Sequence, residues 1–287
     1  MGIIKACIFD LGGTIVDKYS LTPIIAFRNA FLKHKIILPK HSIINYMGMN
    51  KKEHIQKIIE NDNVKDQWLE RNNIEIGDED IDNIYNDFKE IQKGYTIENM
   101  KIIPQTWKCI NELQNRGIQI GVTTGFDKEQ MNLVRLLLER NNIMLDNYVS
   151  STCLESLGRP HPSMIIENMY KFDIDDPREV IKIDDTTVGI KEGLNAGCWT
   201  VGVSRWSVNM DVDTIEEANK MNSVIANATG DNYSDNYYKL VKKRIMSKSK
   251  LEKSGAHYVI ETLLGLPNII DEINDTSKPL RKVIRSL

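Results

Sequence analysis

The sequence predicts an α/β protein, in which a Rossmann-like parallel sheet forms the core and an α-helical cap is inserted after its first strand. Six short runs rich in β-branched residues recur along the 287-residue chain, and most precede a stretch with helical periodicity. This alternation is typical of buried parallel strands in βα units. The first run ends at residue 9 and the next begins at 118, far beyond the roughly 30 residues of a βαβ unit. The intervening chain is therefore predicted to form a separate lobe.

In chain order, the predicted strands cover residues 3–9, 118–124, 148–152, 180–184, 199–204 and 257–260. Between the first two, helical patterns occur near 21–35, 39–46, 51–61 and 78–95, without a convincing strand. A further helix at 104–116 begins with Pro104 and ends before Gly117, the usual punctuation of a helix, and returns the chain to the sheet. We therefore expect a core of residues 1–17 and 101–275 and a helical cap of residues 18–100.

Two stretches carry no sign of chemistry. Residues 223–238 are rich in Asn, Asp, Ser and Tyr, which predicts a surface loop. The tail over residues 276–287 is predicted to be poorly ordered. The functional residues are therefore expected elsewhere, at the ends of the strands and in the cap.

The composition favours a soluble, globular protein whose partners are small substrates or other proteins. The 37 basic and 40 acidic residues leave a net charge of −3, so neither nucleic acid nor an anionic membrane is an expected partner. The four cysteines are scattered without a paired spacing, which favours a reducing compartment. No apolar run approaches the ~20 residues of a membrane span, and the chain enters a strand without a targeting segment. A cytoplasmic location is expected.

Polar residues follow four of the predicted strands. Asp10 ends the first, Thr123 ends the second, Arg159 follows the third, and Asp184 and Asp185 end the fourth. Taken singly, each has an ordinary explanation as a turn, cap or surface residue. Ligands of open parallel sheets bind outside the carboxyl ends of the strands, so their joint placement favours one site. Carboxylates, a hydroxyl and a guanidinium suit Mg²⁺ and a phosphoryl group, with Asp10 as both metal ligand and nucleophile.

The residue two positions after Asp10 limits the chemistry. An aspartate that attacks a phosphate ester needs an acid to protonate the leaving oxygen, and Gly12 cannot donate a proton. The leaving group must therefore be assisted from elsewhere in the protein.

Lys51 is the candidate for that assistance. Asn50 is a predicted N-cap with Glu53 three residues later, which puts Lys51 in the first turn of a helix. The helix dipole, the neighbouring Lys52 and burial under a closed cap all favour its neutral amine. Spacing alone favours an ordinary surface lysine, the fate of most lysines in charged helices. His54, one turn further on, is a candidate proton shuttle or a structural histidine.

Several segments resemble a known superfamily. Its four motifs are matched by Ile8-Phe9-Asp10, Thr123-Thr124-Gly125, Arg159 and Ile183-Asp184-Asp185, and the chain is similar to the haloacid dehalogenase superfamily over nearly its whole length. Within it, the chain resembles the phosphonatase family, the phosphonoacetaldehyde hydrolases. That similarity is carried by Met47-Gly48 with Lys51 and His54, by Gly158-Arg159-Pro160, by Lys191-Glu192-Gly193 and by Gly255-Ala256-His257.

The resemblance implies Mg²⁺-dependent hydrolysis of the P–C bond of phosphonoacetaldehyde. It implies that Lys51 forms a Schiff base with the aldehyde and that Asp10 is phosphorylated. Thr123 and Arg159 would then orient the phosphonate, while Asp185 and the backbone carbonyl of Gly12 would hold the metal. Met47 and Gly48 would shape the cap side of the site, and the protein would form a homodimer through its cap helices.

The chain departs from the phosphonatase pattern at several positions. The family has a further aspartate at the position where this chain has Gly189. It tends to have glycine at the position where this chain has Asp184, so Asp184 is a possible metal ligand. Phe126 replaces a tyrosine and Ser20 replaces a cysteine. These departures keep two alternatives open: another phosphatase or dehalogenase of the superfamily, and a catalytically weak binding or scaffold protein of the same fold.

Overall fold

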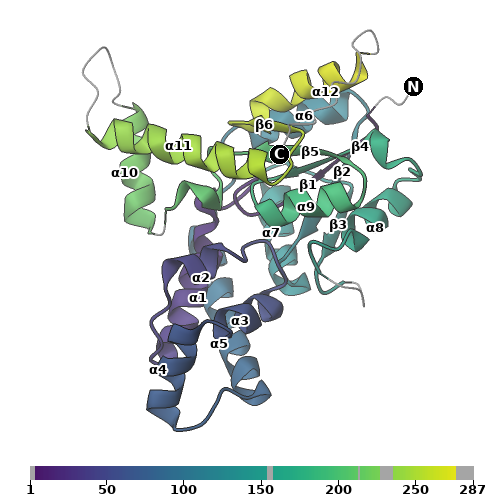
Figure 1. The fold of residues 1–287 in the computed structure, drawn as a ribbon. Helices are drawn as coiled ribbons and strands as arrows, with labels where there is room; N and C mark the ends of the chain where they lie inside the picture. Colours follow the sequence, from purple (N-terminus) through teal and green to yellow (C-terminus); the bar gives the residue numbers. More distant parts are fainter. Residues whose placement is uncertain (1–3, 154–157, 213, 227–234, 276–287) are drawn as a thin grey trace.

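The computed structural model describes residues 4–153, 158–212, 214–226 and 235–275 (Figure 1). At its centre is a six-stranded sheet with the strand order β3-β2-β1-β4-β5-β6, in which every pair is parallel. The strands are β1 (Ala6–Phe9), β2 (Gln119–Thr124), β3 (Asn147–Ser150), β4 (Val180–Asp184), β5 (Trp199–Val203) and β6 (Tyr258–Ile260). The predicted Rossmann-like α/β class is confirmed: β4 has the predicted bounds, and the other five strands are one to three residues shorter than the apolar runs.

Both faces of the sheet are covered, which explains why the central strands β1 and β4 are buried along their whole length. Side chains of β1 alternate between two cores: Cys7 and Phe9 enter one, and Ala6 and Ile8 enter the other. The first core is completed by α6 (Thr106–Asn115), α7 (Lys128–Arg140) and α12 (Leu266–Asn274). On the opposite face lie α8 (Ser163–Lys171), α9 (Thr187–Asn195) and α11 (Asp235–Lys253).

The loop predicted over residues 223–238 is wrong at both ends. Residues 223–226 belong to α10 (Ile215–Ala226) and residues 235–238 begin α11. These two helices project together from the core in Figure 1. Met221 and Leu240 are buried in a shared cluster, so packing outweighs the polar composition on which the loop prediction rested. Residues 227–234 and the predicted tail at 276–287 lie outside the described residues.

The segment between β1 and β2 folds into helices packed around their own core, at one end of the sheet (Figure 1). They are α1 (Leu21–Lys33), α2 (Lys40–Ile44), α3 (Lys51–Ile59), α4 (Asp62–Asn72) and α5 (Asp78–Asn99). The sequence analysis did not predict α4, because only Val64 and Trp68 of this polar helix are buried. We refer to these helices as the cap. Among the described residues, none of the helices has the length and apolar character that crossing a membrane requires.

The chain crosses between core and cap twice, and the two crossings are tied together. The amide of Asp17 donates to the carbonyl of Lys101 over 2.9 Å, and Val16 and Ile102 form an antiparallel bridge. Asp17 has a left-handed backbone, as do Tyr19 and Ser20 after it. These positions turn the chain sharply from the sheet into α1.

A third contact joins core and cap. The segment 206–210 after β5 lies against the first crossing, where the carbonyl of Trp206 accepts a hydrogen bond from the amide of Tyr19. Further along it, Val208 buries its side chain in the cap core. The cap is therefore attached to the core at the two crossings and along this segment, and further contacts, such as the hydrogen bond from the Asn50 amide group to the Ser151 hydroxyl, join the lobes elsewhere.

Candidate active site

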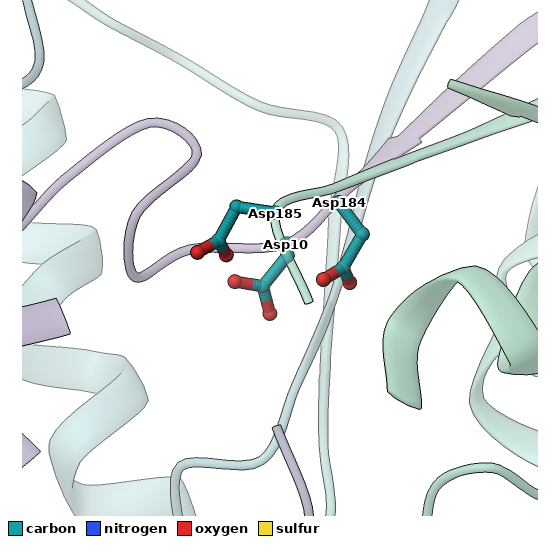
Figure 2. A group of neighbouring side chains, drawn as sticks. All are labelled: Asp10, Asp184 and Asp185. Atoms are coloured by element: carbon teal, nitrogen blue, oxygen red, sulfur yellow. The ribbon is translucent and has the colours of Figure 1, made fainter. Parts of the chain in front are cut away.

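Three aspartates meet where the chain order of the sheet reverses. From β1 the chain continues to β2 and β3 on one side, then returns to β4 on the other, so a crevice opens between the ends of β1 and β4. Asp10 follows β1, and Asp184 and Asp185 end β4. Their carboxylates turn toward the same space in Figure 2, and one oxygen of each lies within 4.8 Å of the others. The predicted convergence of these three residues is therefore present.

Burial of the three aspartates disfavours their charged forms. Burial and the charge of Asp184 raise the pKa of Asp10 to about 6, although Arg159 opposes the shift. Burial and the two neighbouring carboxylates also raise the pKa of Asp185 well above its ordinary value. Three carboxylates at this separation stay ionised together only if positive charge is supplied among them.

Two buried cations supply part of that charge. Arg159 donates to Asp10 over 2.8 Å, to the hydroxyl of Thr123 over 2.7 Å, and lies 2.8 Å from Glu192. Lys182, in the middle of β4, also donates to the Thr123 hydroxyl over 2.7 Å. Four of these side chains are fully buried, so they form a charged network beneath the nucleophile. Sequence analysis missed Lys182 and Glu192, although a lysine inside an apolar, doubly covered strand is itself a signal.

The residues at the crevice fit a divalent cation. Counted formally, the four buried carboxylates Asp10, Asp184, Asp185 and Glu192 exceed the two buried cations Arg159 and Lys182 by two negative charges. A charge of that size and sign would be neutralised by one Mg²⁺, which prefers carboxylate oxygens and water. Asp10 and Asp185 fit best as ligands, because Asp184 is already occupied: one of its oxygens accepts from the amide and hydroxyl of Thr186 over 2.8 and 2.7 Å, and the other lies 3.1 Å from Lys182.

Asp185 is held in place by two loops. One of its oxygens accepts a hydrogen bond from the amide of Val208 over 2.9 Å. The loop after β1 comes so close that a Cβ atom on Gly13 would lie 2.4 Å from the same carboxylate, and Gly13 also has a positive φ of 75°. Only glycine satisfies both conditions. The loop sequence therefore brings Asp10 and Asp185 together.

Asp184 occupies the space that a side chain at position 189 would need. A Cβ atom on Gly189 would lie 1.8 Å from an oxygen of Asp184. The two departures from the phosphonatase pattern, Asp184 and Gly189, are therefore neighbours in the structure. The carboxylate on β4 fills the space that a side chain on the facing helix α9 would need.

The cap completes a small cavity above Asp10. Its wall consists of residues from both lobes: Asp10, Gly12, Ser20, Pro23, Met47, Gly48, Lys51, Thr124, Gly125, Phe126 and Thr186. Seven of the predicted site residues lie in this wall, and they come from the loop after β1, from α3 and its preceding loop, and from the loop after β2. The predicted residues Thr123, Arg159, Asp184 and Asp185 are absent from it and lie beneath or beside Asp10.

Lys51 is the amine of this cavity. It is only 4% exposed, and its Nζ lies 5.9 Å from the ring centre of Phe27 and 5.7 Å from that of Phe126. No other described residue forms a hydrogen bond or ion pair with this amine. Burial lowers the pKa of Lys51 to about 8, although Asp10 opposes the shift. The predicted N-cap holds the helix start in place, because Asn50 accepts from the amides of Lys52 and Glu53.

His54 lies behind Lys51, within the cap core. Its ring packs 4.3 Å from that of Phe27 and is fully buried. Burial, together with the charge of Lys51, lowers the pKa of His54 well below its ordinary value, so the ring is neutral. It is not part of the cavity wall, so its geometry favours support of the helix over proton transfer.

Two neighbouring threonines have different surroundings. The hydroxyl of Thr123 donates to Glu192 over 3.0 Å and accepts from the two buried cations, so it belongs to the network beneath the cavity. Thr124, the next residue, lies in the cavity wall. Sequence analysis selected Thr123, whereas the alternation of side chains along β2 favours Thr124 as the hydroxyl that meets a ligand.

The cap is closed on the core. A Cβ atom on Gly125 would lie 2.5 Å from the carbonyl oxygen of Met49 and 2.6 Å from that of Gly48, so backbone meets backbone here. The cavity left between the lobes is about 20 Å³, room for about one water molecule. In this arrangement of the two lobes, the cavity has little room for a ligand larger than water.

The fold and the site define a hydrolase class, and comparison with known proteins agrees. A family described as haloacid dehalogenase-like hydrolase matches residues 7–203. The chain belongs to this family. Within it, the chain is similar to phosphonoacetaldehyde hydrolases: it is 32% identical over 271 residues to that of Vibrio parahaemolyticus, covering 94% of each chain. The resemblance drawn from the sequence is therefore confirmed.

Two further relatives agree with this placement. A bifunctional phosphonoacetaldehyde hydrolase/aminoethylphosphonate transaminase of Clostridioides difficile is 31% identical, covering 96% of this chain and 41% of that protein. A crystal structure of a phosphonoacetaldehyde hydrolase-like protein from Oleispira antarctica is 28% identical and superposes with a TM-score of 0.84, covering 95% of this chain and 93% of that one. The chain is thus an enzyme of the hydrolase class.

Proposed function

We propose that the protein hydrolyses the carbon–phosphorus bond of phosphonoacetaldehyde to acetaldehyde and phosphate in the presence of Mg²⁺. One observation carries the proposal: a buried amine with a lowered pKa, Lys51, and a buried strand-end carboxylate, Asp10, line the same closed cavity. Relatives named phosphonoacetaldehyde hydrolase support the choice of substrate.

The first step is condensation at Lys51. Its neutral amine attacks the aldehyde carbon, water leaves, and a protonated imine forms with the substrate. Burial of the amine favours its neutral form, because the water that would solvate an ammonium group is excluded.

The second step breaks the P–C bond. A carboxylate oxygen of Asp10 attacks phosphorus, and the electron pair of the P–C bond moves into the iminium to give an enamine on Lys51. Protonation of the enamine carbon and addition of water release acetaldehyde and restore the amine. A second water hydrolyses the aspartyl phosphate on Asp10 and releases phosphate.

The remaining groups stabilise charge. Arg159 holds Asp10 over 2.8 Å and presents a planar guanidinium beside the phosphonate, while the Thr124 hydroxyl meets the ligand from the cavity wall. Asp10, Asp185 and the backbone carbonyl of Gly12 would hold Mg²⁺, which supplies positive charge for the phosphoryl oxygens when bound.

Gly12 separates this proposal from a phosphate ester phosphatase. A Cβ atom on Gly12 would already lie 3.4 Å from the hydroxyl of Ser20 and 3.6 Å from the ring of Phe126. A longer acidic side chain would therefore enter the space between the nucleophile and the cap. Because a carbon leaving group is released as an enamine, the proposed reaction requires no acid at this position.

Trapping of the imine tests the proposal. The protein is incubated with phosphonoacetaldehyde, Mg²⁺ and borohydride, and the reduced adduct is located by peptide mass mapping. We expect the adduct on Lys51 and none on Lys52, the next residue of the same helix, whose side chain is partly exposed. Hydrolysis of phosphate esters without any adduct on Lys51 would instead support the phosphatase alternative. The homodimer and the cytoplasmic location stay predictions.

A further inference from the structure

Lys182 takes no part in the mechanism above, yet it is among the most completely buried charged residues of the protein. Its side chain is fully inaccessible and lies among Thr123, Asp184 and Glu192, at 2.7, 3.1 and 3.4 Å. Removing an ammonium group from water is costly unless its partners repay the loss. A lysine at this position in a parallel strand therefore calls for a specific role.

The helix that faces β4 is shaped around these charges. A Cβ atom on Gly193 would lie 2.7 and 2.9 Å from the Cβ and Cγ atoms of Lys182, and one on Gly189 would overlap the carboxylate of Asp184. The two glycines stand four residues apart and so share one face of α9. That face accommodates the two charged side chains of β4 one after the other.

Glu192, from the same helix, links the two cations. It lies 2.8 Å from Nε of Arg159 and 3.4 Å from Nζ of Lys182, and it accepts a hydrogen bond from Thr123. Arg159 therefore touches Asp10 with one nitrogen while Glu192 and Thr123 fix the rest of its planar group. Without Lys182, both Asp184 and Glu192 would depend on Arg159 alone for their neutralisation.

We propose that Lys182 and Glu192 are positioning residues for the phosphoryl-transfer step. Lys182 neutralises Asp184 and Glu192, which leaves one edge of Arg159 directed at Asp10. The pair acts on attack at phosphorus and leaves imine formation at Lys51 in the cap unaffected. This inference rests on the proposed function. Within that function, attack on phosphorus needs the pair, and imine formation does not.

The test compares three variants: Lys182→Met, Glu192→Gln, and the two combined. The double variant removes one charge of each sign, so it keeps the charge balance of the cluster. Lys191→Met is the matched control, because it makes the same substitution at an exposed position of α9. The measurements are the thermal unfolding midpoint, kcat and KM for phosphonoacetaldehyde, and the yield of borohydride adduct on Lys51.

For the double variant we expect a midpoint close to that of the starting protein, an unchanged adduct yield, and a kcat lower by about 10²-fold with little change in KM. A wild-type kcat in the folded double variant would overturn the inference, as would a parallel loss of adduct and turnover. If the double variant does not fold, Glu192→Gln, which preserves shape, is judged by the same criteria.

Failure of the proposed function has a different signature. The unsubstituted protein would then give no adduct on Lys51. The positioning role is still measurable in that case, because beryllium fluoride with Mg²⁺ forms a phosphoryl mimic on a reactive aspartate. We expect the ¹⁹F NMR signal of this complex at Asp10 in the unsubstituted protein and its weakening in the double variant. An equal signal in both proteins would overturn the positioning role.

Discussion

The two halves of the site handle charge in opposite ways. On the core side, Arg159 and Lys182 lie 2.8 to 3.4 Å from the carboxylates of Asp10, Asp184 and Glu192. Above it, the cap side surrounds the single amine of Lys51 with aromatic rings at 5.7 and 5.9 Å. The core half surrounds its charged groups with partners of opposite charge, whereas the cap half favours the neutral form of its amine by burying it without such partners.

This contrast matches the needs of the two proposed reactions. Attack on a phosphonate dianion needs fixed positive charge, and fixed charge needs partners that do not reorganise. Condensation with an aldehyde needs an uncharged amine, and burial without partners provides one. A single environment could not serve both steps. The inserted cap brings the two environments together at one cavity.

Removal of the nucleophile should have the largest effect on the core half. We expect Asp10→Asn to lower kcat by at least about 10⁴-fold, because the amide cannot form the aspartyl phosphate. The adduct on Lys51 should still form in this variant. Steady-state kinetics and borohydride trapping together check the result, with Asp82→Asn on the exposed face of the cap as control. Loss of the adduct as well would mean that the two halves do not act separately.

Replacement of the amine should be the largest change in the cap half. Lys51→Arg keeps the positive charge but cannot form an imine, so we expect turnover to fall by roughly 10³-fold or more. The matched control is Lys52→Arg, which should retain full activity. Phosphate release is the measurement, and substantial release by Lys51→Arg would show that P–C cleavage proceeds without the imine.

The dependence of kcat/KM on pH should show a smaller effect that also distinguishes the two environments. With a pKa of about 8, the neutral fraction of Lys51 increases about tenfold between pH 7 and pH 9. We therefore expect kcat/KM to rise by about tenfold over this range and then to level off. Protonation of Asp10, whose pKa is raised to about 6, should deepen the loss at acid pH. An inflection near the ordinary pKa of lysine, 10.5, would show that the cap does not desolvate the amine.

The smallest expected effect concerns the wall of the cavity. Phe126→Tyr restores the residue of the phosphonatase pattern and adds a hydroxyl to a ring that lies beside Lys51. We expect a change in kcat/KM of about threefold or less, because the ring keeps its packing. Phosphonoacetaldehyde kinetics of the variant check this. A change of 10²-fold would mean that the missing hydroxyl determines specificity.

The sequence predicted the fold well because its signals are local. Six apolar runs, the long gap after Asp10 and well-marked helix ends were enough to place the sheet and the helices inserted after β1. Its failures have a common cause. Helix α4 and the ends of the 223–238 stretch are polar segments, and a few buried side chains such as Trp68 and Leu240 decide their structure. That packing is tertiary and leaves little periodic trace.

Most residues of the site could be predicted from the sequence, but the contacts between them could not. Asp10, Asp185 and Lys51 were identified from strand ends and resemblance, and the structure brings them to one crevice and its cap. The pairing of Lys182 with Glu192, and the occupation of the space at Gly189 by Asp184, depend on how α9 packs on β4. The close packing of α9 on β4 leaves no pattern in the spacing of residues along the chain, so these features are visible only in the folded structure.

Val208 connects the two lobes through a single residue. Its amide donates to Asp185, and its side chain is buried in the cap core. A hydrogen bond to a carboxylate is stronger when that carboxylate is charged, so the strength of this contact follows the charge on Asp185. One residue thus contacts both the Asp185 carboxylate and the apolar interior of the cap, so a change of charge on Asp185 would act directly on a residue that is packed among the cap helices.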